Sequence, residues 1–326
     1  MSKATIKIGV IGCANIAERF VIPAINNTNA FNLVAIASRT SAKAEEFANK
    51  FNIKPVASYE ALLDIEDLQA VYIPLPNSLH YEWIKKSLAK GKHVLVEKSM
   101  ACSVAEVEEL NKEAQELGLV LLENFQFRKH AQLAKMKAIV AEGKIGELRA
   151  IRSSFGFPAF SDKNNIRYKK ELGGGALLDA GAYPLKIAQE FVSDILYVDS
   201  ASLHVDPEYD VDTWGAVQLK GQGTYLTVQA AFGFDHAYQC SVELWGSEGV
   251  LKSNRIFTSP PGAEAELVLT NKEGTELIKI VADNHFENML AHFADLIYFP
   301  EKAASEYIAN VQQARLIEQL RSKACE

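Results

Sequence analysis

Two short stretches carry side chains whose types and spacing could do proton chemistry. Glu97 and Lys98 stand directly behind "HVLV", an apolar run typical of a buried strand. Asp179 and Tyr183 lie four positions apart in "LLDAGAYPL", and residues at that spacing share one face of a helix. A tyrosine hydroxyl can donate a proton to a carbonyl oxygen, and a nearby ammonium group favours the phenolate that remains. The alternative is structural: a charged strand end in solvent, a surface acid and a core aromatic ring.

A third stretch places small residues between an apolar run and a helix-like segment. Aligned on the dinucleotide fingerprint GxGxxG, "GCANIA" from Gly12 gives G-x-A-x-x-A. Gly12 permits the tight turn, the small residues let the backbone approach a pyrophosphate, and the helix start offers unpaired N–H groups. The alternative is an ordinary tight turn. The stretch predicts dinucleotide binding by Gly12, Cys13, Ala14, Asn15 and Ile16.

The end of the second apolar run bears on which dinucleotide would bind. Proteins that bind NAD usually place Asp or Glu there for the ribose hydroxyls, whereas this chain has Ser38 and Arg39, with Lys43 soon after. An acid would repel a 2′-phosphate, but Arg39 can bind one through charge-assisted hydrogen bonds. Although a solvated arginine at a strand end is the alternative, the combination favours NADP(H) over NAD(H).

The third apolar run leaves its strand through two prolines, in "IPLPNSLHYEW". Because ligands bind at the carboxyl ends of strands in such sheets, Leu75, Asn77 and His80 are candidates for the nicotinamide side of the cofactor. For His80 the sequence favours a structural role in the first turn of the following helix.

The elements that must position these residues differ between the two parts of the chain. Up to residue 123, apolar runs alternate with amphipathic helical stretches, which indicates βαβ units and a parallel sheet. From residue 124, strand-like runs separated by turn signals such as "KGQG" and "NKEG" indicate a mostly antiparallel open sheet, with helical segments at the end. We therefore predict an α/β protein with a Rossmann dinucleotide-binding domain at 1–123 and an α+β domain at 124–326.

Composition excludes several classes of function. The 326 residues carry a net charge of -7, which argues against nucleic-acid binding. The sequence has no apolar run of membrane-spanning length and no signal-peptide core at its start, so we expect a cytoplasmic protein without membrane partners. The four cysteines and seven histidines are scattered, so we expect reduced thiols and no metal site.

Four stretches together resemble the glucose–fructose oxidoreductase, inositol dehydrogenase and rhizopine-catabolism (Gfo/Idh/MocA) family. They are "IGVIGCANIAERFVIPAI", "AVYIPLPNSLHYEWIKKSLAKGKHVLVEK", "GKIGELRAIR" and "ELGGGALLDAGAYPLKIA". The family's EKP tripeptide implies Glu97 at the cofactor and Lys98 at both nicotinamide and substrate, although Ser99 stands here in place of proline. The family's D-x-G-x-H/Y segment implies that Asp179 and Tyr183 face the cofactor.

The resemblance also implies roles for residues around the second domain. Its entry, "ENFQFRKH", borders the family's cleft, which makes Asn124 a candidate for the cofactor and Gln126 and Arg128 candidates for the substrate. Arg167 lies in a basic loop that could meet an anionic substrate or could simply be solvated. The second domain would bind substrate and associate into a homodimer or homotetramer, because members often pair through the open sheet.

Within the family, the resemblance is to nucleotide-sugar 3-ketoreductases and dihydrodiol dehydrogenases. It implies reduction of a ketosugar, perhaps nucleotide-linked, by NADPH, with Lys98 and Tyr183 as the proton-donating pair and Asp179 orienting substrate hydroxyls. One alternative is an NADP+-dependent dehydrogenase of a free sugar or trans-dihydrodiol. An alternative of another class is a non-catalytic NADP(H)-binding sensor.

Overall fold

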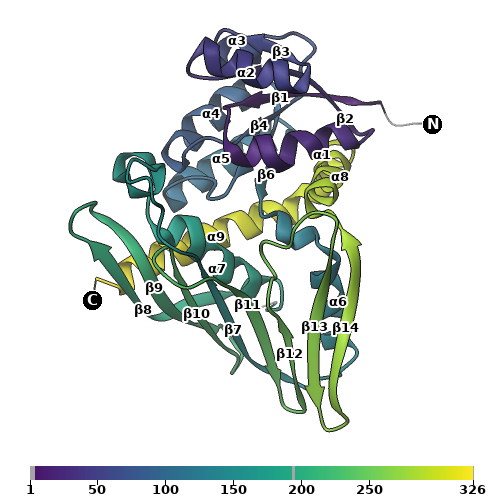
Figure 1. Cartoon of the computed structure of the whole chain (residues 1–326), viewed down its shortest axis with the longest axis vertical. Helices are drawn as coiled ribbons and strands as arrows, with labels where there is room; N and C mark the ends of the chain where they lie inside the picture. Colours follow the sequence, from purple (N-terminus) through teal and green to yellow (C-terminus); the bar gives the residue numbers. More distant parts are fainter. Residues whose placement is uncertain (1–3, 193–194, 326) are drawn as a thin grey trace. The chain divides into compact units, whose positions relative to one another are not determined.

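The computed structural model describes residues 4–192 and 195–325, which form two compact units (Figure 1). The first unit consists of Met1–Asn124 with Phe286–Val311, and the second consists of Phe125–His285 with Gln312–Glu326. The chain first passes from the first unit to the second between Asn124 and Phe125, one residue after the predicted boundary between residues 123 and 124.

The first unit is built on a six-stranded sheet in the order β3-β2-β1-β4-β5-β6. Every neighbouring pair of strands is parallel, and this order is that of a Rossmann fold. The prediction of a Rossmann domain is confirmed. The sequence analysis did not foresee β3, because it is a three-residue edge strand with a lysine and a proline. The strands are β1 Ile6–Ile11, β2 Phe31–Ala37, β3 Lys54–Val56, β4 Ala70–Ile73, β5 His93–Glu97 and β6 Leu121–Asn124.

Helices follow the strands of this unit in the alternation that the apolar pattern predicts. The best-defined start is that of α5, where Ser103 and Glu106 form a reciprocal capping box. The helices are α1 Ile22–Asn27, preceded by a π-helical turn at Ala17–Val21, α2 Ser41–Phe51, α3 Tyr59–Leu63, α4 Asn77–Ala89 and α5 Val104–Glu116.

The second unit is built on an eight-stranded sheet in the order β14-β13-β12-β11-β7-β10-β9-β8. Only β10 and β7 pair in parallel, so the predicted mostly antiparallel open sheet is confirmed. The strands are β7 Leu148–Gly156, β8 Leu196–Asp206, β9 Val211–Gly221, β10 Thr227–Gly233, β11 Gln239–Gly246, β12 Gly249–Ser253, β13 Ala263–Asn271 and β14 Gly274–Asp283.

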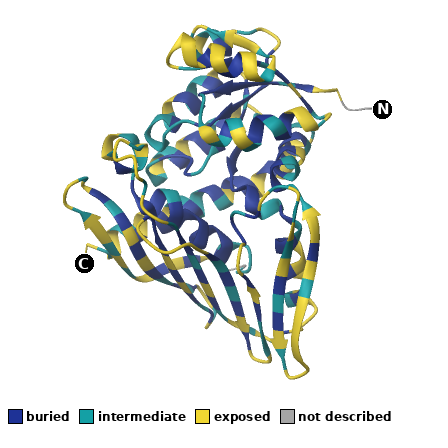
Figure 2. Ribbon diagram, viewed as in Figure 1, coloured by how far each residue is buried: buried dark blue, intermediate teal, exposed yellow. Residues whose placement is uncertain are grey.

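The two faces of this sheet differ in what covers them. Helix α6 (Ala131–Ala141) packs against β13 and β14, and α7 (Ala182–Gln189) packs against β7 and β10. Residues along the strands alternate between buried and exposed (Figure 2). The strand pairing puts one cross-sheet row on the outer face: Gln218, Gln229, Arg152, Glu243, Lys252, Val268 and Leu277.

The helices α8 (His285–Tyr298) and α9 (Ala304–Lys323) correct the predicted domain boundary. The ring of Phe286 stacks on Phe20 at 5.0 Å, and Phe293 stacks on Phe31 at 5.8 Å. These contacts assign 286–311 to the first unit rather than to a continuous domain at 124–326. The later part of α9 belongs to the second unit, where the Gln313 side chain donates to the Ala182 carbonyl at 2.9 Å. Helical periodicity shows that a segment has an apolar face but does not show which partner covers it.

Within residues 4–192 and 195–325, we find no helix that combines the length and apolar character needed to cross a membrane.

Candidate active site

The fingerprint turn at the end of β1 has the geometry that its glycine predicts. Gly12 has a φ of 115°, and a Cβ placed there would lie 2.7 Å from the Cδ2 of Leu75. The Gly12 N–H donates to the Ala37 carbonyl at 2.9 Å, and the next helical turn begins with a bond from Glu18 N–H to the Ala14 carbonyl. Burial raises the pKa of the Cys13 thiol, although the Ser38 hydroxyl beside it acts in the opposite direction.

Arg39 and Lys43, the two cations predicted to meet a 2′-phosphate, differ in their surroundings. The ammonium group of Lys43 pairs with Glu46 at 3.1 Å and lies 5.3 Å from the ring centroid of Phe47. Arg39 is exposed at the end of β2, and its guanidinium forms no ion pair with any residue in the described parts of the chain. Arg39 is therefore the cation available to an anionic group.

Tyr59 is a candidate that the sequence analysis missed. Its hydroxyl lies against the Arg39 backbone, burial raises its pKa, and its ring meets Trp83 edge-on at 4.8 Å. Tyr59 begins α3, directly after the short strand β3, and neither element has a pattern that stands out in the sequence. The sequence offers one weak signal for Tyr59 as a site residue, namely an aromatic side chain twenty positions after Arg39.

His80 is fully buried and joins two of the loops at this edge. Its Nδ1 lies 2.7 Å from the Ser99 carbonyl oxygen and its Nε2 lies 2.8 Å from the Leu75 carbonyl oxygen. Burial lowers the pKa of His80 to about 4, and the charge of Lys98 acts in the same direction. These bonds give His80 the structural role that the sequence favours, and they hold Leu75 against the glycine turn. Asn77 is half-buried at the start of α4.

Glu97 and Asn124 form a hydrogen-bonded cluster at the ends of β5 and β6. One carboxylate oxygen of Glu97 accepts from the Tyr72 hydroxyl and from the Asn124 amide, each at 2.7 Å. Burial raises the pKa of Glu97, and these two donors partly offset that rise. Asn124 is 2% exposed, and its Oδ1 has no hydrogen-bond partner among the described atoms. This buried acceptor is suited to a donor from a bound ligand.

Lys98 follows Glu97 directly and is half-buried. The Lys98–Ser99 peptide bond is cis, although Ser99 stands where the family has proline. The backbone after Ser99 is also held in place, because the Met100 N–H donates to the Glu123 carboxylate at 2.8 Å.

In the second unit, the helical segment that carries Asp179 and Tyr183 starts at a glycine-rich turn. Gly175 has a φ of 110°, and a Cβ there would lie 2.4 Å from the Oδ1 of Asp212. The other oxygen of Asp212 accepts from the Leu177 N–H at 2.5 Å, which caps the π-helical turn Leu177–Gly181 that leads into α7. Burial raises the pKa of Asp212, and the hydrogen bond from Leu177 opposes that rise.

Asp179 is held by Arg167 in a two-point ion pair. Nε of Arg167 contacts one carboxylate oxygen, and Nη2 lies 3.3 Å from the other. Burial disfavours the charged guanidinium, but the charge and hydrogen bond of Asp179, together with Tyr183, more than offset this, so the pKa of Arg167 is raised. The guanidinium carbon also lies 4.7 Å from the centroid of the Phe160 ring. Arg167 therefore orients Asp179.

Tyr183 is 8% exposed and is surrounded by aromatic rings from separate segments. This environment excludes water from most of the ring, and the sequence analysis did not find it. The ring centroids nearest Tyr183 are Phe155 at 5.0 Å, Phe257 at 5.4 Å, Phe125 at 5.6 Å and Phe127 at 5.9 Å.

The structure brings the remaining predicted substrate residues into other interactions. Gln126 is buried in a 3-10 turn at Gln126–Lys129. Nε of Arg128 pairs with Glu190 at 2.6 Å, and that carboxylate also pairs with Lys137 at 2.5 Å. Arg128 thus contributes to an ion-pair network within the second unit.

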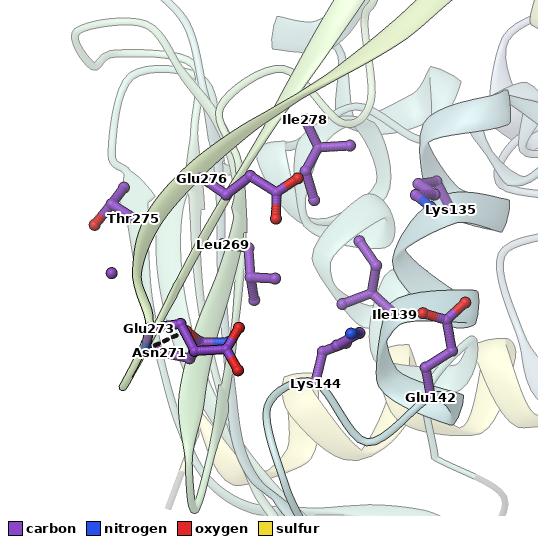
Figure 3. Close-up of a pocket in the computed structure, with 11 residues that line it drawn as sticks. Lys135, Ile139, Glu142, Lys144, Leu269, Asn271, Glu273, Thr275, Glu276 and Ile278 are labelled. Atoms are coloured by element: carbon purple, nitrogen blue, oxygen red, sulfur yellow. Dashed lines mark hydrogen bonds between the residues drawn. The ribbon is translucent and has the colours of Figure 1, made fainter.

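A cavity of about 380 Å³ lies apart from these residues, between α6 and the β13–β14 hairpin (Figure 3). Lys135 and Lys144 face this space together with Glu142, Glu273 and Glu276. The charges of the two signs are mixed, and none of the predicted site residues lines the cavity.

Proteins of known function resemble the chain along almost its whole length. The model of an oxidoreductase family with an NAD-binding Rossmann fold matches residues 6–125, and that of the GFO/IDH/MocA C-terminal domain matches residues 133–252. The dTDP-3,4-didehydro-2,6-dideoxy-alpha-D-glucose 3-reductase of Actinomadura kijaniata is 38% identical over 320 residues, which cover 98% of this chain and 96% of that enzyme. The Saccharopolyspora spinosa enzyme of the same name is 37% identical over 319 residues, 96% of each chain.

A solved structure agrees with these sequence relatives. The crystal structure of a 3-ketoreductase from Actinomadura kijaniata, in complex with NADP and TDP-benzene, has a TM-score of 0.94 to this chain. The two share 36% sequence identity, and the similarity covers 98% of each. Further crystal structures of that enzyme carry a tyrosine-to-phenylalanine or a lysine-to-alanine substitution.

Proposed function

The chain belongs to the Gfo/Idh/MocA family of oxidoreductases, and from this premise we propose that it reduces a nucleotide-linked ketosugar with NADPH. The observation that carries the proposal is the full-length similarity to dTDP-sugar 3-reductases at 37–38% identity. The solved relative binds NADP and a TDP derivative, which supports both the cofactor and the nucleotide on the substrate.

The first unit offers residues that fit NADP(H). The turn from Gly12 to Ile16 would approach the pyrophosphate, and Ser38, Arg39 and Lys43 would meet the 2′-phosphate. The buried Oδ1 of Asn124, which has no hydrogen-bond partner among the described atoms, suits an amide donor such as the nicotinamide carboxamide. Bound NADPH supplies the hydride, whereas the protein supplies position and a path for the proton. Leu75, Asn77, His80 and Glu97 shape the same edge of the sheet.

The chain's own residues would supply the proton in this proposal. Lys98 and Tyr183 form the proton-donating pair for the carbonyl oxygen of the sugar, and a lysine and a tyrosine are also the residues replaced in variants of the crystallised relative. Asp179, held by Arg167, orients the sugar hydroxyls. The presence of Lys98, Asp179 and Tyr183 together favours an enzyme over a non-catalytic sensor.

We further propose that the protein is a homodimer or homotetramer that associates through the outer face of the eight-stranded sheet. Tyr197, Trp214, Trp245 and Leu277 point to this face and are 40–59% exposed. Several large apolar side chains exposed on one sheet face are typical of a protein–protein interface. Sedimentation of the protein and of a Trp214→Glu, Trp245→Glu variant tests this, and two monomeric species would contradict it.

Turnover with a panel of substrates tests the catalytic proposal. We expect NADPH oxidation with a dTDP-linked ketosugar, loss of turnover in Lys98→Met and in Tyr183→Phe, and unchanged NADPH binding in both variants. NADP+ reduction by a free sugar or dihydrodiol alone would favour the dehydrogenase alternative. NADPH binding without turnover in either direction would favour the sensor, and unchanged turnover in both variants would remove Lys98 and Tyr183 from the mechanism.

A further inference from the structure

Helix α7 contains a lysine whose burial has no role in the proposed reaction. Lys186 is 1% exposed and is among the largest fully buried side chains of the described chain. Lysine is almost never fully buried unless its charge is compensated. Part of that compensation is the ring of Phe125, because the ammonium nitrogen lies 5.3 Å from the ring centroid.

The same phenylalanine also contacts Tyr183. The two rings meet edge-to-face, with centroids 5.6 Å apart and an interplanar angle of 88°. Lys186 follows Tyr183 by three positions in α7, and residues at that spacing are neighbours on one helix face. The ammonium group and the phenol therefore pack on one ring, within surroundings formed by further aromatic side chains. A charge acts more strongly in such surroundings than in water.

We propose that Lys186 is a positioning residue that acts through Tyr183, with its ammonium charge stabilising the phenolate left when Tyr183 gives up its proton. Its effect on catalysis rests on the proposed function, whereas its effect on ionisation of Tyr183 does not. The positive charge makes the proton easier to release because it favours the phenolate over the neutral phenol.

Other charged groups on the segments around Tyr183 have interaction partners of their own. Arg167 interacts electrostatically with Tyr183, but the Asp179 carboxylate pairs with that guanidinium. Arg128, next to Phe127, pairs with Glu190. Near Phe257, the side chain of Arg255 donates to the Thr258 carbonyl at 3.1 Å. Lys98 belongs to the first unit and is unchanged in every variant used below.

Ionisation of Tyr183 can be followed without any substrate. The near-ultraviolet absorbance of tyrosinate is titrated in the wild type and in Tyr183→Phe, and the difference between the two curves isolates Tyr183. The same difference is measured between Lys186→Met and the Lys186→Met, Tyr183→Phe double variant. We expect the midpoint to lie about one pH unit higher when Lys186 is replaced by methionine, the order of shift produced by a nearby charge in partly buried surroundings.

Two further variants separate charge from packing. Lys186→Arg keeps the charge and should keep the midpoint of the wild type, whereas Lys186→Gln is a second neutral replacement, for use if the methionine variant does not fold. Circular dichroism establishes folding in each case. Equal midpoints for the wild type and a folded neutral variant overturn the proposal, and so does a shift of the arginine variant as large as that of the neutral one. Because no turnover is measured, failure of this test is distinct from failure of the proposed function.

Discussion

The carboxyl edge of the first sheet and helix α7 of the second unit position their candidate residues by different means. At the sheet edge, the candidates lie at or just after the carboxyl ends of several strands, and hydrogen bonds such as those of His80 and Glu97 join these ends. In the second unit, Asp179 in the π-helical turn Leu177–Gly181 and Tyr183 in α7 belong to one continuous helical segment, and rings from distant segments surround Tyr183.

This difference predicts which property a substitution in each region should change. Polar contacts at the sheet edge set the shape of loops that would hold a cofactor, so changes there should alter cofactor binding and stability. Packing and capping around α7 set the placement of a proton donor, so changes there should alter turnover while cofactor affinity stays the same. Three predictions test this contrast between the two regions.

The largest expected effect is on stability and concerns His80. Its pKa is about 4 in the folded protein, below the ordinary value of 6.5, because burial disfavours the charged ring. Between these two values the unfolded chain binds a proton that the folded protein excludes, so stability is lost as pH falls from about 6.5 to about 4. The loss from this one group is roughly 3 kcal/mol when complete.

Urea unfolding at pH 7 and pH 4.5 measures this loss. We expect the free energy of unfolding to fall less with pH in His80→Gln than in the wild type. The matched control is His236→Gln, since His236 is exposed, and it should behave like the wild type. An identical pH dependence in His80→Gln would show that other groups account for the acid sensitivity.

The next effect concerns Arg39 and cofactor choice. Replacing Arg39 by aspartate removes a donor for the 2′-phosphate and adds a repelling charge, whereas NADH has no phosphate at that position. We expect NADPH affinity to fall about 10- to 100-fold, as for the loss of a hydrogen bond to a charged group, with a much smaller change for NADH. Calorimetric titration measures both, and Lys90→Gln is the control because Lys90 pairs with Asp64 and is not among the predicted cofactor residues. Equal losses of affinity for NADPH and NADH would show that Arg39 has a structural role rather than one in binding the 2′-phosphate.

The smallest effect belongs to Asp212, which caps the segment leading into α7. Asp212→Ala should cost about 1 kcal/mol of stability, as for other lost caps, and should lower kcat while NADPH affinity stays the same. Asp199→Ala is the control in the same sheet, because the Asp199 carboxylate forms a surface pair with Lys220. Weakened NADPH binding in Asp212→Ala, with kcat unchanged, would reverse the contrast between the two regions.

Much of this protein follows from local patterns in the sequence. Alternating apolar strands and amphipathic helices determine the Rossmann unit, and Gly12 marks a turn whose φ of 115° excludes most other residues. The order of residues along strands and loops also places Arg39, Lys98 and Asn124 at strand ends. These inferences hold because periodicity and turn chemistry depend on neighbours within a few positions.

Only the tertiary structure decided which partners these residues meet. It assigned 286–311 to the first unit, paired Arg167 with Asp179 and Arg128 with Glu190, and placed Asp212 at the start of the segment before α7. It also gathered the rings around Tyr183 and set Lys186 over Phe125. Such contacts join residues tens of positions apart, and no local propensity specifies them, because they depend on how whole elements pack together.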